Sequence, residues 1–559
     1  MSRRIAGTRD AVTGSTALLV LFLVGYPLIM LAVGSFSGPR PADAGPLGLR
    51  AYFSLFQELD LLANSLKVAV GSTMVAMIVG VSLAWVLVRT NVPWAAFLEQ
   101  IVIVPFYLSA LLGAVGWALL ASPSKAGILN SLLMSWLSLD KAPINIYTEL
   151  GIIWVSGLHF APFCFLFSIG ALRSMEPSLE DSARVLGGGT ASTMMKITLP
   201  LILPAIVGSS LLVFVLAMGQ FGIPAVLGLP NGYHVLTTRI YELIIGFNPD
   251  YGLAAAMGIS LFAFSALGVW LQIRILGTRK YTTVTGKGFR PRVINVGNFR
   301  WVFFVAVIAY VIVAVVLPVG ALLYASLQPF ITSNIFEAKF TLANFHYIFF
   351  VYPTTALALS NTFLLAGGGA TITLLLAGVL AWMIVRRRGA LSRLIEVSIM
   401  IPVAIPGIVF SIGLLWAWIR APIPIYGTIW ILLLCYVTIF IPYGVRAISA
   451  SLHQIDQSLE ECATVIGANW QQVLRGILLP LLRPGLMAAW TLVFISIIKE
   501  LSASALLYNS KTIVLSVAVF DLWIGSSLTY VAALALVEAL AIFLVLWVAR
   551  RIVGAGAIL

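Results

Sequence analysis

The chain has 559 residues, of which 61% are hydrophobic and only 9% are charged. Soluble domains carry roughly 25% charged residues, so this composition excludes a soluble globular protein and indicates an integral membrane protein. The apolar runs 18–33, 68–88 and 301–322 approach or reach the roughly 20 residues that a membrane-spanning helix needs, and they are too long for transmembrane β-strands. The net charge of +13 is explained by basic cytoplasmic loops and not by a nucleic-acid partner.

Apolar segments recur along the whole chain and predict an all-α membrane fold. The first segment follows Arg3, Arg4 and Arg9 without a small-residue cleavage site, so it is interpreted as a retained helix and not as a signal peptide. The predicted spans are 15–35, 62–88, 98–120, 148–172, 201–222, 252–276, 301–326, 360–385, 392–419, 426–447, 481–500 and 529–550. Lys and Arg gather on alternate loops, which predicts that both termini are cytoplasmic.

The two halves of the chain repeat one another. The Leu-Ala-Trp and Val-Arg residues at 83–89 recur at 380–386, an offset of 297. The offset falls to 280 between Pro162 and Pro442, so the first half holds 17 additional residues, which we expect in the external loop at 122–147. An even number of spans in each half predicts two parallel six-helix repeats, related by an axis along the membrane normal.

This repetition predicts three parts. We expect a first six-span half at 1–276, a basic cytoplasmic linker at 277–300, and a second six-span half at 301–559. The linker carries many basic residues and no acid.

A polar loop interrupts each half at the same place. The first loop (residues 178–200) begins Ser-Leu-Glu-Asp, and the second loop (residues 458–480) begins Ser-Leu-Glu-Glu. Serine at a helix start with acids in the first turn suits the helix dipole, and Gly187 and Gly467 permit a turn. The loops predict a short helix, a glycine turn and a return to the membrane. An ordinary capped loop explains one copy, but two copies in register favour a repeated docking surface.

The second loop carries Glu-x-Ala, three residues, Gly, nine residues and Ile-x-Leu-Pro. This pattern resembles the Glu-Ala-Ala signature of the transmembrane subunits of bacterial ABC importers, with Cys462 in place of one Ala and with Asp181 and Ser182 as departures in the first loop. In that family the loop forms a coupling helix that sits in a cleft of a cytoplasmic ATPase. The resemblance implies ATPase-coupling roles for Glu180, Asp181, Ser182, Ala183, Gly187, Leu199, Pro200, Glu460, Glu461, Cys462, Ala463, Gly467, Leu479 and Pro480.

The chain shows no nucleotide site of its own. The nearest match to a phosphate-binding loop, Gly286-Lys287, lacks the following Ser or Thr, and no metal-ligand cluster is evident. We therefore expect no catalytic residue, no metal and no cofactor on this chain. The resemblance implies two copies of an ABC ATPase that hold ATP and Mg²⁺, a periplasmic binding protein, membrane lipid, and a multi-pass location in the bacterial inner membrane.

Two further segments bear on the substrate. Residues 220–228 and 499–503 resemble the Phe-Gly-x-Pro-Ala and Lys-Glu-Leu-x-Ala segments of fused ferric-iron importer permeases, with Ser502 where proline is usual. That resemblance implies iron(III), with aminoethylphosphonate, thiamine or a polyamine as alternatives. The rival class is a secondary transporter driven by an ion gradient.

Charged residues near the membrane interior are candidates for function. Lys499 and Glu500 either line the path or lie at the external interface, and Glu538 is expected to be functional or paired with another helix. The candidate path residues are Gln220, Phe221, Lys499, Glu500 and Ser502.

Overall fold

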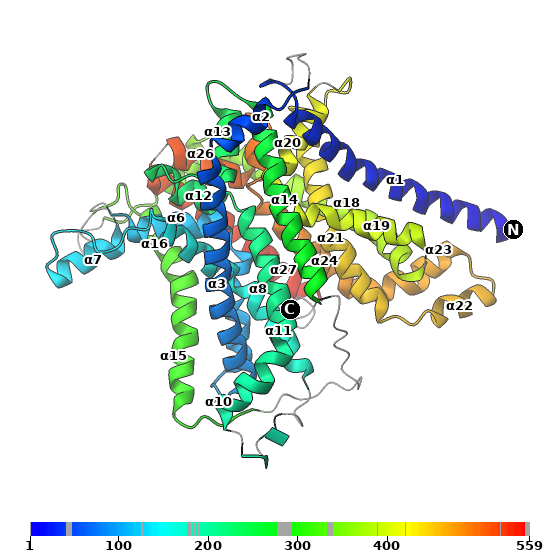
Figure 1. Cartoon of the computed structure of the whole chain (residues 1–559), viewed down its shortest axis with the longest axis horizontal. Coiled ribbons are helices and arrows are strands. Elements are labelled where there is room, and N and C mark those ends of the chain that lie inside the picture. The colour runs from blue at the N-terminus through cyan, green and yellow to red at the C-terminus, as the bar shows by residue number, and fades with distance from the viewer. Residues whose placement is uncertain are drawn as a thin grey trace.

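In the computed structural model, the described residues are 2–40, 47–123, 127–175, 180, 182–183, 185–187, 189–276, 293–332, 339–387, 389–419, 421–525 and 527–553. Throughout these ranges the chain forms helices joined by loops (Figure 1). One isolated parallel bridge, between Thr90 and Ile294, is the only β-pairing in the same ranges. The all-α prediction is confirmed.

The first half contains the helices that precede residue 277. They are α1 (Ser2–Ser35), α2 (Arg50–Phe56), α3 (Leu59–Arg89), α4 (Ala95–Val102), α5 (Val104–Tyr107), α6 (Ala110–Ala121), α7 (Ile128–Leu137), α8 (Glu149–Ser174), α10 (Thr190–Thr193), η1 (Met194–Thr198), α11 (Leu199–Met218), α12 (Gly222–Leu227), η2 (Leu229–Asn231), α13 (Leu236–Ile245) and α14 (Tyr251–Leu276).

The second half repeats this order with small differences. Its helices are α15 (Phe299–Val311), η3 (Ile312–Val316), α16 (Leu317–Ser326), α17 (Ala343–His346), η5 (Tyr347–Val351), α18 (Thr354–Arg386), α19 (Ala390–Met400), η6 (Ile401–Ala404), α20 (Gly407–Trp418), α21 (Ile429–His453), α22 (Ser458–Val465), α23 (Trp470–Val473), η7 (Leu474–Leu478), α24 (Leu479–Ile498), α25 (Ser504–Leu507), α26 (Leu515–Gly525) and α27 (Leu528–Val553).

Ten helices in the described ranges are long and apolar enough to cross a membrane, and two bent helix pairs bring the number to twelve. The bent pairs fall on the predicted spans 98–120 and 392–419, which are therefore not straight. They bend by 93° and 109°, because two successive residues are extended at each break, Leu108 and Ser109 in the first half and Ile405 and Pro406 in the second. In the second break the proline also disfavours helix at the residue before it.

The first membrane helix of each half packs against the other half. Helix α1 packs on α20, and the equivalent α16 packs on α6. Glycines permit both contacts: a Cβ atom on Gly116 would lie 2.6 Å from the backbone oxygen of Pro318, and one on Gly413 would lie 2.6 Å from that of Pro27. Close backbone approach at small residues is the usual way in which membrane helices associate. The exchange ties the halves into one body.

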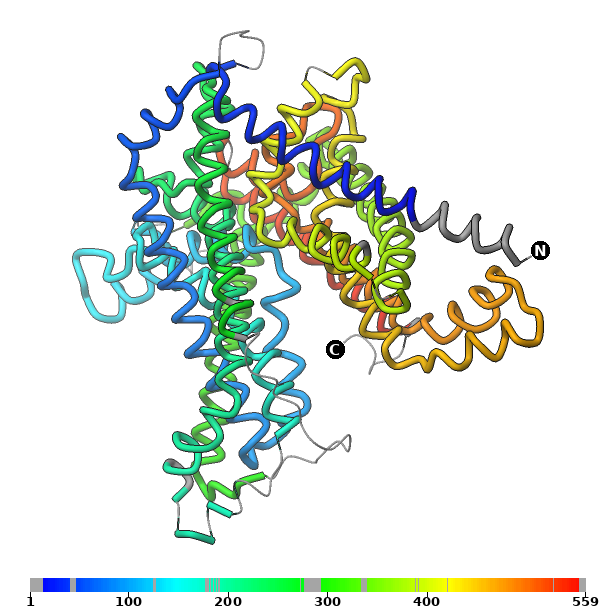
Figure 2. The backbone as a smooth tube through the Cα atoms, turned by 45° about the vertical axis from the view of Figure 1, so that its right-hand side comes forward, coloured from blue at the N-terminus to red at the C-terminus, as the bar shows by residue number. Residues whose placement is uncertain are grey.

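The two polar loops lie at the ends of two separate arms. In Figures 1 and 2, α10 ends the arm that contains α3, α8 and α11, whereas α22 and α23 end the arm that contains α18, α21 and α24. Helices α2 and α13 lie at the other end of α3 from α10 (Figure 1). The repeated loops therefore lie at the far ends of two arms, with α10 at the bottom and α22 and α23 at the right of Figure 1.

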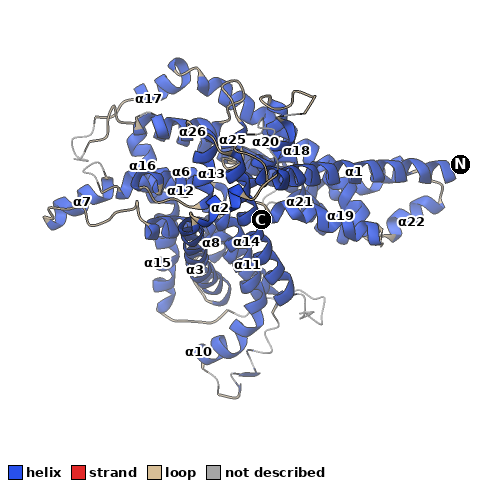
Figure 3. Ribbon diagram, turned by 45° about the horizontal axis from the view of Figure 1, so that its top comes forward, coloured by secondary structure: helices blue, strands red, loops and turns tan. Residues whose placement is uncertain are grey.

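The additional residues of the first half form a hairpin that carries α7. Asn130 closes the hairpin: its amide donates to the carbonyl oxygens of Ser122 and Ile144, both at 2.7 Å, and its side-chain oxygen accepts from the Ile144 N–H at 3.1 Å. Helix α7 projects sideways, away from α10 and α22 (Figure 3). The structure agrees with the prediction that the insertion lies in 122–147.

Most of the predicted linker, residues 277–292, lies outside the described residues. Its end is anchored to the first half, where the Ile294 N–H donates to the Arg89 carbonyl oxygen at 2.8 Å. The side chain of Asn91 adds bonds to Asn295 and to the Val296 N–H, both at 3.0 Å. The linker thus reaches the second half along the end of α3.

Candidate functional site

The second polar loop is described throughout and has the predicted form of a helix, a turn and a return. Helix α22 carries Glu460 and Glu461 in its first turn. Gly467 has φ +90°, a left-handed conformation that disfavours any residue with a Cβ. The chain then continues through α23 and η7 into α24, whose first two residues are Leu479 and Pro480.

The prediction that Ser458 caps this helix is wrong. Ser458 is the first helical residue, and its own N–H donates to Asp456 Oδ1 at 2.9 Å. This bond, together with the Ser458 hydroxyl, lowers the pKa of Asp456. The capping group therefore comes from two residues earlier, because the turn after α21 brings the short Asp456 side chain back over the helix start.

The first polar loop follows the same course where it is described. Gly187 has φ +84°, and α11 begins with Leu199 and Pro200. Ser182 and Ala183 are helical. Asp181 lies outside the described residues, as does Ser178. The two loops therefore share the glycine turn and the return into a membrane helix.

Each loop exposes a pair of large apolar side chains just before its glycine. Val185 and Leu186 are 86% and 87% exposed, and Val465 and Ile466 are both 85% exposed. The two loops therefore carry the same small apolar patch beside the glycine turn. Glu461 and Cys462 are also exposed on the second loop, whereas Ala463 is buried against the chain's own apolar cluster.

Two glutamates of the loops point inward. Glu180 is 5% exposed and pairs with Arg89, and Glu460 pairs with Arg386. From the sequence, both arginines served as markers of orientation and of the repeat between the halves, and no partner was predicted for them. The sequence did hold one signal for the two ion pairs: the arginines repeat between the halves at an offset of 297, and the glutamates repeat at an offset of 280.

A second candidate site lies between the halves. We call it the chamber: a cavity of about 500 Å³ lined by residues at all four helix breaks of the two halves. These are Phe106, Ser109, Ala110 and Leu111 at the bend before α6; Pro402, Val403, Ile405, Pro406 and Gly407 at the bend before α20; Gln220 and Gly222 at the break between α11 and α12; and Lys499, Glu500, Leu501 and Ser502 between α24 and α25. Irregular backbone at membrane depth is tolerated where it is buried in protein or lines a cavity.

Four of the five candidate path residues, Gln220, Lys499, Glu500 and Ser502, line this chamber. Phe221 does not line it; the Phe221 ring is fully buried and packs against Tyr241 and Phe520. Glu538, in α27, is also fully buried, so it does not face lipid. The geometry favours the path over the external interface for the adjacent Lys499 and Glu500, and their role in transport stays a prediction.

The two charged residues of the chamber have different surroundings. The Glu500 carboxylate accepts from the N–H groups of Ala503 and Ser504 at 2.9 and 3.1 Å, and from the Ser504 hydroxyl at 2.7 Å. It therefore caps α25. The Lys499 ammonium donates to the backbone carbonyl oxygen of Phe106, and it lies 4.6 Å from the centre of the Phe106 ring. A lysine has three donors, so the ammonium retains donors for other acceptors.

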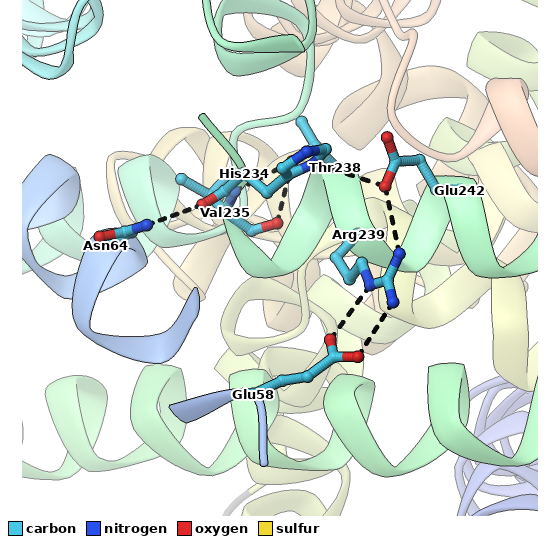
Figure 4. A network of polar contacts seen from close by, with 7 residues as sticks. All are labelled: Glu58, Asn64, His234, Val235, Thr238, Arg239 and Glu242. Atoms are coloured by element: carbon cyan, nitrogen blue, oxygen red, sulfur yellow. Dashed lines mark hydrogen bonds and ion pairs between the residues drawn. The ribbon is translucent and has the colours of Figure 1, made fainter. Parts of the chain in front are cut away.

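A polar network ties α13 to the start of α3 (Figure 4), at the end of α3 that lies away from α10 in Figure 1. Arg239 donates to both carboxylate oxygens of Glu58, at 3.1 and 2.9 Å, which raises the Arg239 pKa. Glu242 lies 3.5 Å from Arg239 and 3.3 Å from His234. A bidentate pair fixes orientation as well as distance, so this end of the first half is held as one unit.

Comparison with protein families gives one match that covers both halves. Residues 72–279 and 369–554 match the model of the binding-protein-dependent transport system inner membrane component. The matched segments include both polar loops and most of the chamber lining.

Curated relatives extend over most of the chain. A ferric transport system permease of Actinobacillus pleuropneumoniae is 28% identical over 89% of this chain and 71% of its own length. An Fe(3+)-transport system permease of Haemophilus influenzae is 26% identical over 90% of this chain and 91% of its own length. A spermidine/putrescine transport system permease of H. influenzae is 27% identical over 47% of this chain and 92% of its own length.

Among solved structures, a chain of a bacterial ABC transporter involved in the import of alginate matches with a TM-score of 0.41 and 23% identity. The match covers 48% of the present chain and 96% of the other.

Proposed function

The chain belongs to the family of binding-protein-dependent transport system inner membrane components, with two copies of the family's module on one polypeptide, and we propose that it forms the membrane pathway of an ATP-driven importer for iron(III). As a member of this family it is a transport subunit and not an enzyme. We propose an ATPase that drives transport, a binding protein that delivers the solute, and iron(III) as the transported solute.

The observation that carries the proposal is the pair of repeated loops at the ends of the two arms. Each loop offers two exposed apolar side chains and a left-handed glycine turn, and the second loop also offers the short polar helix α22. Two equal surfaces on one chain fit two copies of one partner. We propose that the partner is a cytoplasmic ABC ATPase that binds ATP and Mg²⁺, so that both loops and both termini lie on the cytoplasmic side.

The chamber is the proposed site through which the transported solute passes. It lies between the halves and is lined by equivalent breaks from both of them. In the proposed cycle, closure of the two ATPase subunits draws the arms together and turns the chamber toward the periplasmic side, where a binding protein delivers the cargo. Opening of the arms then releases the cargo to the cytoplasm, as rigid bodies rock about a shared site.

Iron(III) is proposed because three relatives that match about nine-tenths of this chain are named as ferric transport permeases. The spermidine/putrescine permease matches only half of the chain, as expected for a protein with one copy of the module. A polyamine, thiamine or aminoethylphosphonate stays an alternative cargo, to be decided by the same experiment.

The test is reconstitution of the affinity-purified complex into proteoliposomes. The proposal predicts that an ATPase and a binding protein co-purify with the chain, and that uptake of radioactive iron(III) requires ATP and stops with vanadate. If no ATPase co-purifies and an ion gradient alone drives uptake, the chain is a secondary transporter and the proposal fails. Uptake of another solute in place of iron would overturn only the choice of cargo.

A further inference from the structure

The end of the second membrane helix in each half carries an arginine that faces the polar loop of the same half. In the second half, Arg386 Nε lies 2.8 Å from Glu460 Oε1, with side chains 10% and 12% exposed. In the first half, Arg89 Nη2 lies 3.6 Å from Glu180 Oε1, with side chains 0% and 6% exposed. We call these two ion pairs the latches.

We propose that the latches are positioning residues that transmit movement of the polar loops to the membrane helices lining the chamber. The inference rests on the proposed function, because it assumes that a motor moves the loops. It adds a role for Arg89 and Arg386, and it separates the two acids of the second loop into different tasks.

The side chains of both ion pairs are largely buried. A charge removed from water is costly unless a partner and further hydrogen bonds compensate it, and removing one partner of a buried pair is strongly destabilising. Both halves hold such a pair at equivalent positions, with side chains no more than 12% exposed. A pair that served only to mark the cytoplasmic side would lie in water.

The direction of the glutamates is the second argument. Glu460 turns inward to Arg386, whereas the next residue, Glu461, is exposed and accepts from Gln457 at 2.9 Å. One acid is therefore available to a partner and the other is committed to the chain's own helix. Truncating the two acids should have different consequences.

The contacts around the latches are the third argument. Arg89 also donates to the Leu172 carbonyl oxygen of α8 at 3.2 Å, and Glu180 accepts from Thr198 of η1 at 2.8 Å. Arg386 also donates to the Ile455 carbonyl oxygen just after α21 at 2.9 Å. Each latch thus joins the loop to the ends of the second and fourth membrane helices of its half.

The fourth helices continue from the latches to the chamber. His159 of α8 and Tyr443 of α21 both line the chamber, and they lie on the same helices whose ends the latches hold. A helix transmits displacement along its axis because its backbone bonds are internal. When the ion pair is present, movement of the loop can therefore displace the helix that lines the chamber. When the ion pair is broken, the loop can move without displacing that helix.

The test uses the reconstituted complex and measures uptake per ATP hydrolysed, with co-purified ATPase as a separate readout. The variants are Glu460→Gln, Arg386→Gln and the double variant. Arg386→Lys serves as the conservative rescue, and Arg393→Gln as the matched control, since Arg393 is an exposed arginine on the neighbouring α19. A residue that only stabilises the fold would lower the yield of complex and leave the uptake-to-ATP ratio unchanged.

We expect either single variant to lower uptake per ATP about three- to thirty-fold, the range that coupling residues typically show, with ATPase still bound. The double variant should be no worse than the poorer single variant, since both remove one interaction. Arg386→Lys should recover most of the ratio, and Arg393→Gln should keep it. A ratio within about two-fold of wild type for both single variants would overturn the inference.

A milder variant covers the case in which the charge changes prevent folding. Thr198→Val removes only the hydroxyl that holds Glu180, with little change in volume, and should lower uptake per ATP about two- to five-fold. A wild-type ratio in Thr198→Val would count against the first latch. If the wild-type chain brings down no ATPase, the proposed function itself fails; if it does and the latch variants couple normally, only the latches fail.

Discussion

Gly116 of α6 lies so close to Pro318 of α16 that a Cβ atom on the glycine would come within 2.6 Å of the proline carbonyl oxygen. The equivalent contact, between Gly413 and Pro27, joins α20 to α1 with the same 2.6 Å approach. Both contacts cross from one half of the chain to the other. The exchange of first helices therefore depends on two glycines.

Gly116→Ala should destabilise the protein by about 1–3 kcal/mol, because the added methyl meets backbone that has no room to move. Gly113→Ala is the matched control: it lies one turn earlier in α6 and has open space around its Cβ position. The measurement is the thermal unfolding midpoint in detergent. Equal midpoints for the two variants would contradict the close contact.

The sequence predicted the number and the order of the membrane helices well. Length and apolarity determine a span, and the twelve predicted segments correspond to the ten long helices and the two bent pairs. The 93° bend could not be predicted, since Leu108 and Ser109 have no distinctive sequence signal and the tertiary structure holds them extended. The 109° bend had a partial signal in Pro406, which disfavours helix at the residue before it.

The candidate site was predictable in part. Repetition located both loops and their glycine turns, and the family resemblance pointed to residues 220–228 and 499–503. The sequence could not show that Glu500 caps α25 while Lys499 faces the chamber, because adjacent residues differ only in where the fold directs them. It also could not pair Arg386 with Glu460, which are 74 positions apart.

The glycine turn of the second loop can be tested with one methyl group. Gly467→Ala places a side chain at φ +90°, which costs roughly 1–2 kcal/mol for a left-handed residue, so we expect a distorted loop and reduced ATPase binding. Gly476→Ala is the control, since Gly476 lies in η7 with open space around its Cβ position. Equal retention of ATPase by both variants would show that the turn is dispensable.

The cap of α22 gives a prediction about pH. The Ser458 N–H lowers the pKa of Asp456 below its ordinary value near 3.8, so the stabilisation is present at neutral pH and is lost as the pH falls through that lowered value. A spin label on the exposed Cys462 reports the mobility of α22. Asp456→Ala should raise this mobility at pH 7, and the difference from wild type should shrink as the pH falls through the lowered pKa of Asp456. No difference at pH 7 would refute the cap.

The two charged residues of the chamber should respond differently to truncation. Glu500→Ala leaves the N–H groups of Ala503 and Ser504 without their acceptor, so the unfolding midpoint should fall, with a loss of about 1–3 kcal/mol. Lys499→Gln should leave the midpoint near wild type but reduce uptake about ten-fold, as expected for a group that faces cargo. If Lys499→Gln lowered the midpoint and Glu500→Ala lowered only uptake, the two roles would be contradicted.

The two loops also permit a labelling test. Cys164 and Cys435 are buried and Cys462 is exposed, so a maleimide should react with wild-type protein at Cys462 alone. If an ATPase covers the second loop, its presence should slow this reaction severalfold. Labelling at an unchanged rate in the intact complex would show that the loop is not the docking surface.

The central claim is that a motor draws the two arms together through the repeated loops. The most direct measurement is the distance between spin labels at Cys462 on the second loop and at an introduced Ser192→Cys on the first, both exposed positions. A second pair within one arm, Cys462 and Arg393→Cys, serves as the rigid control. We predict that ATP with vanadate shortens the distance between the loops in the reconstituted complex and leaves the control pair unchanged. A distance between the loops that stays the same with and without nucleotide would contradict the account.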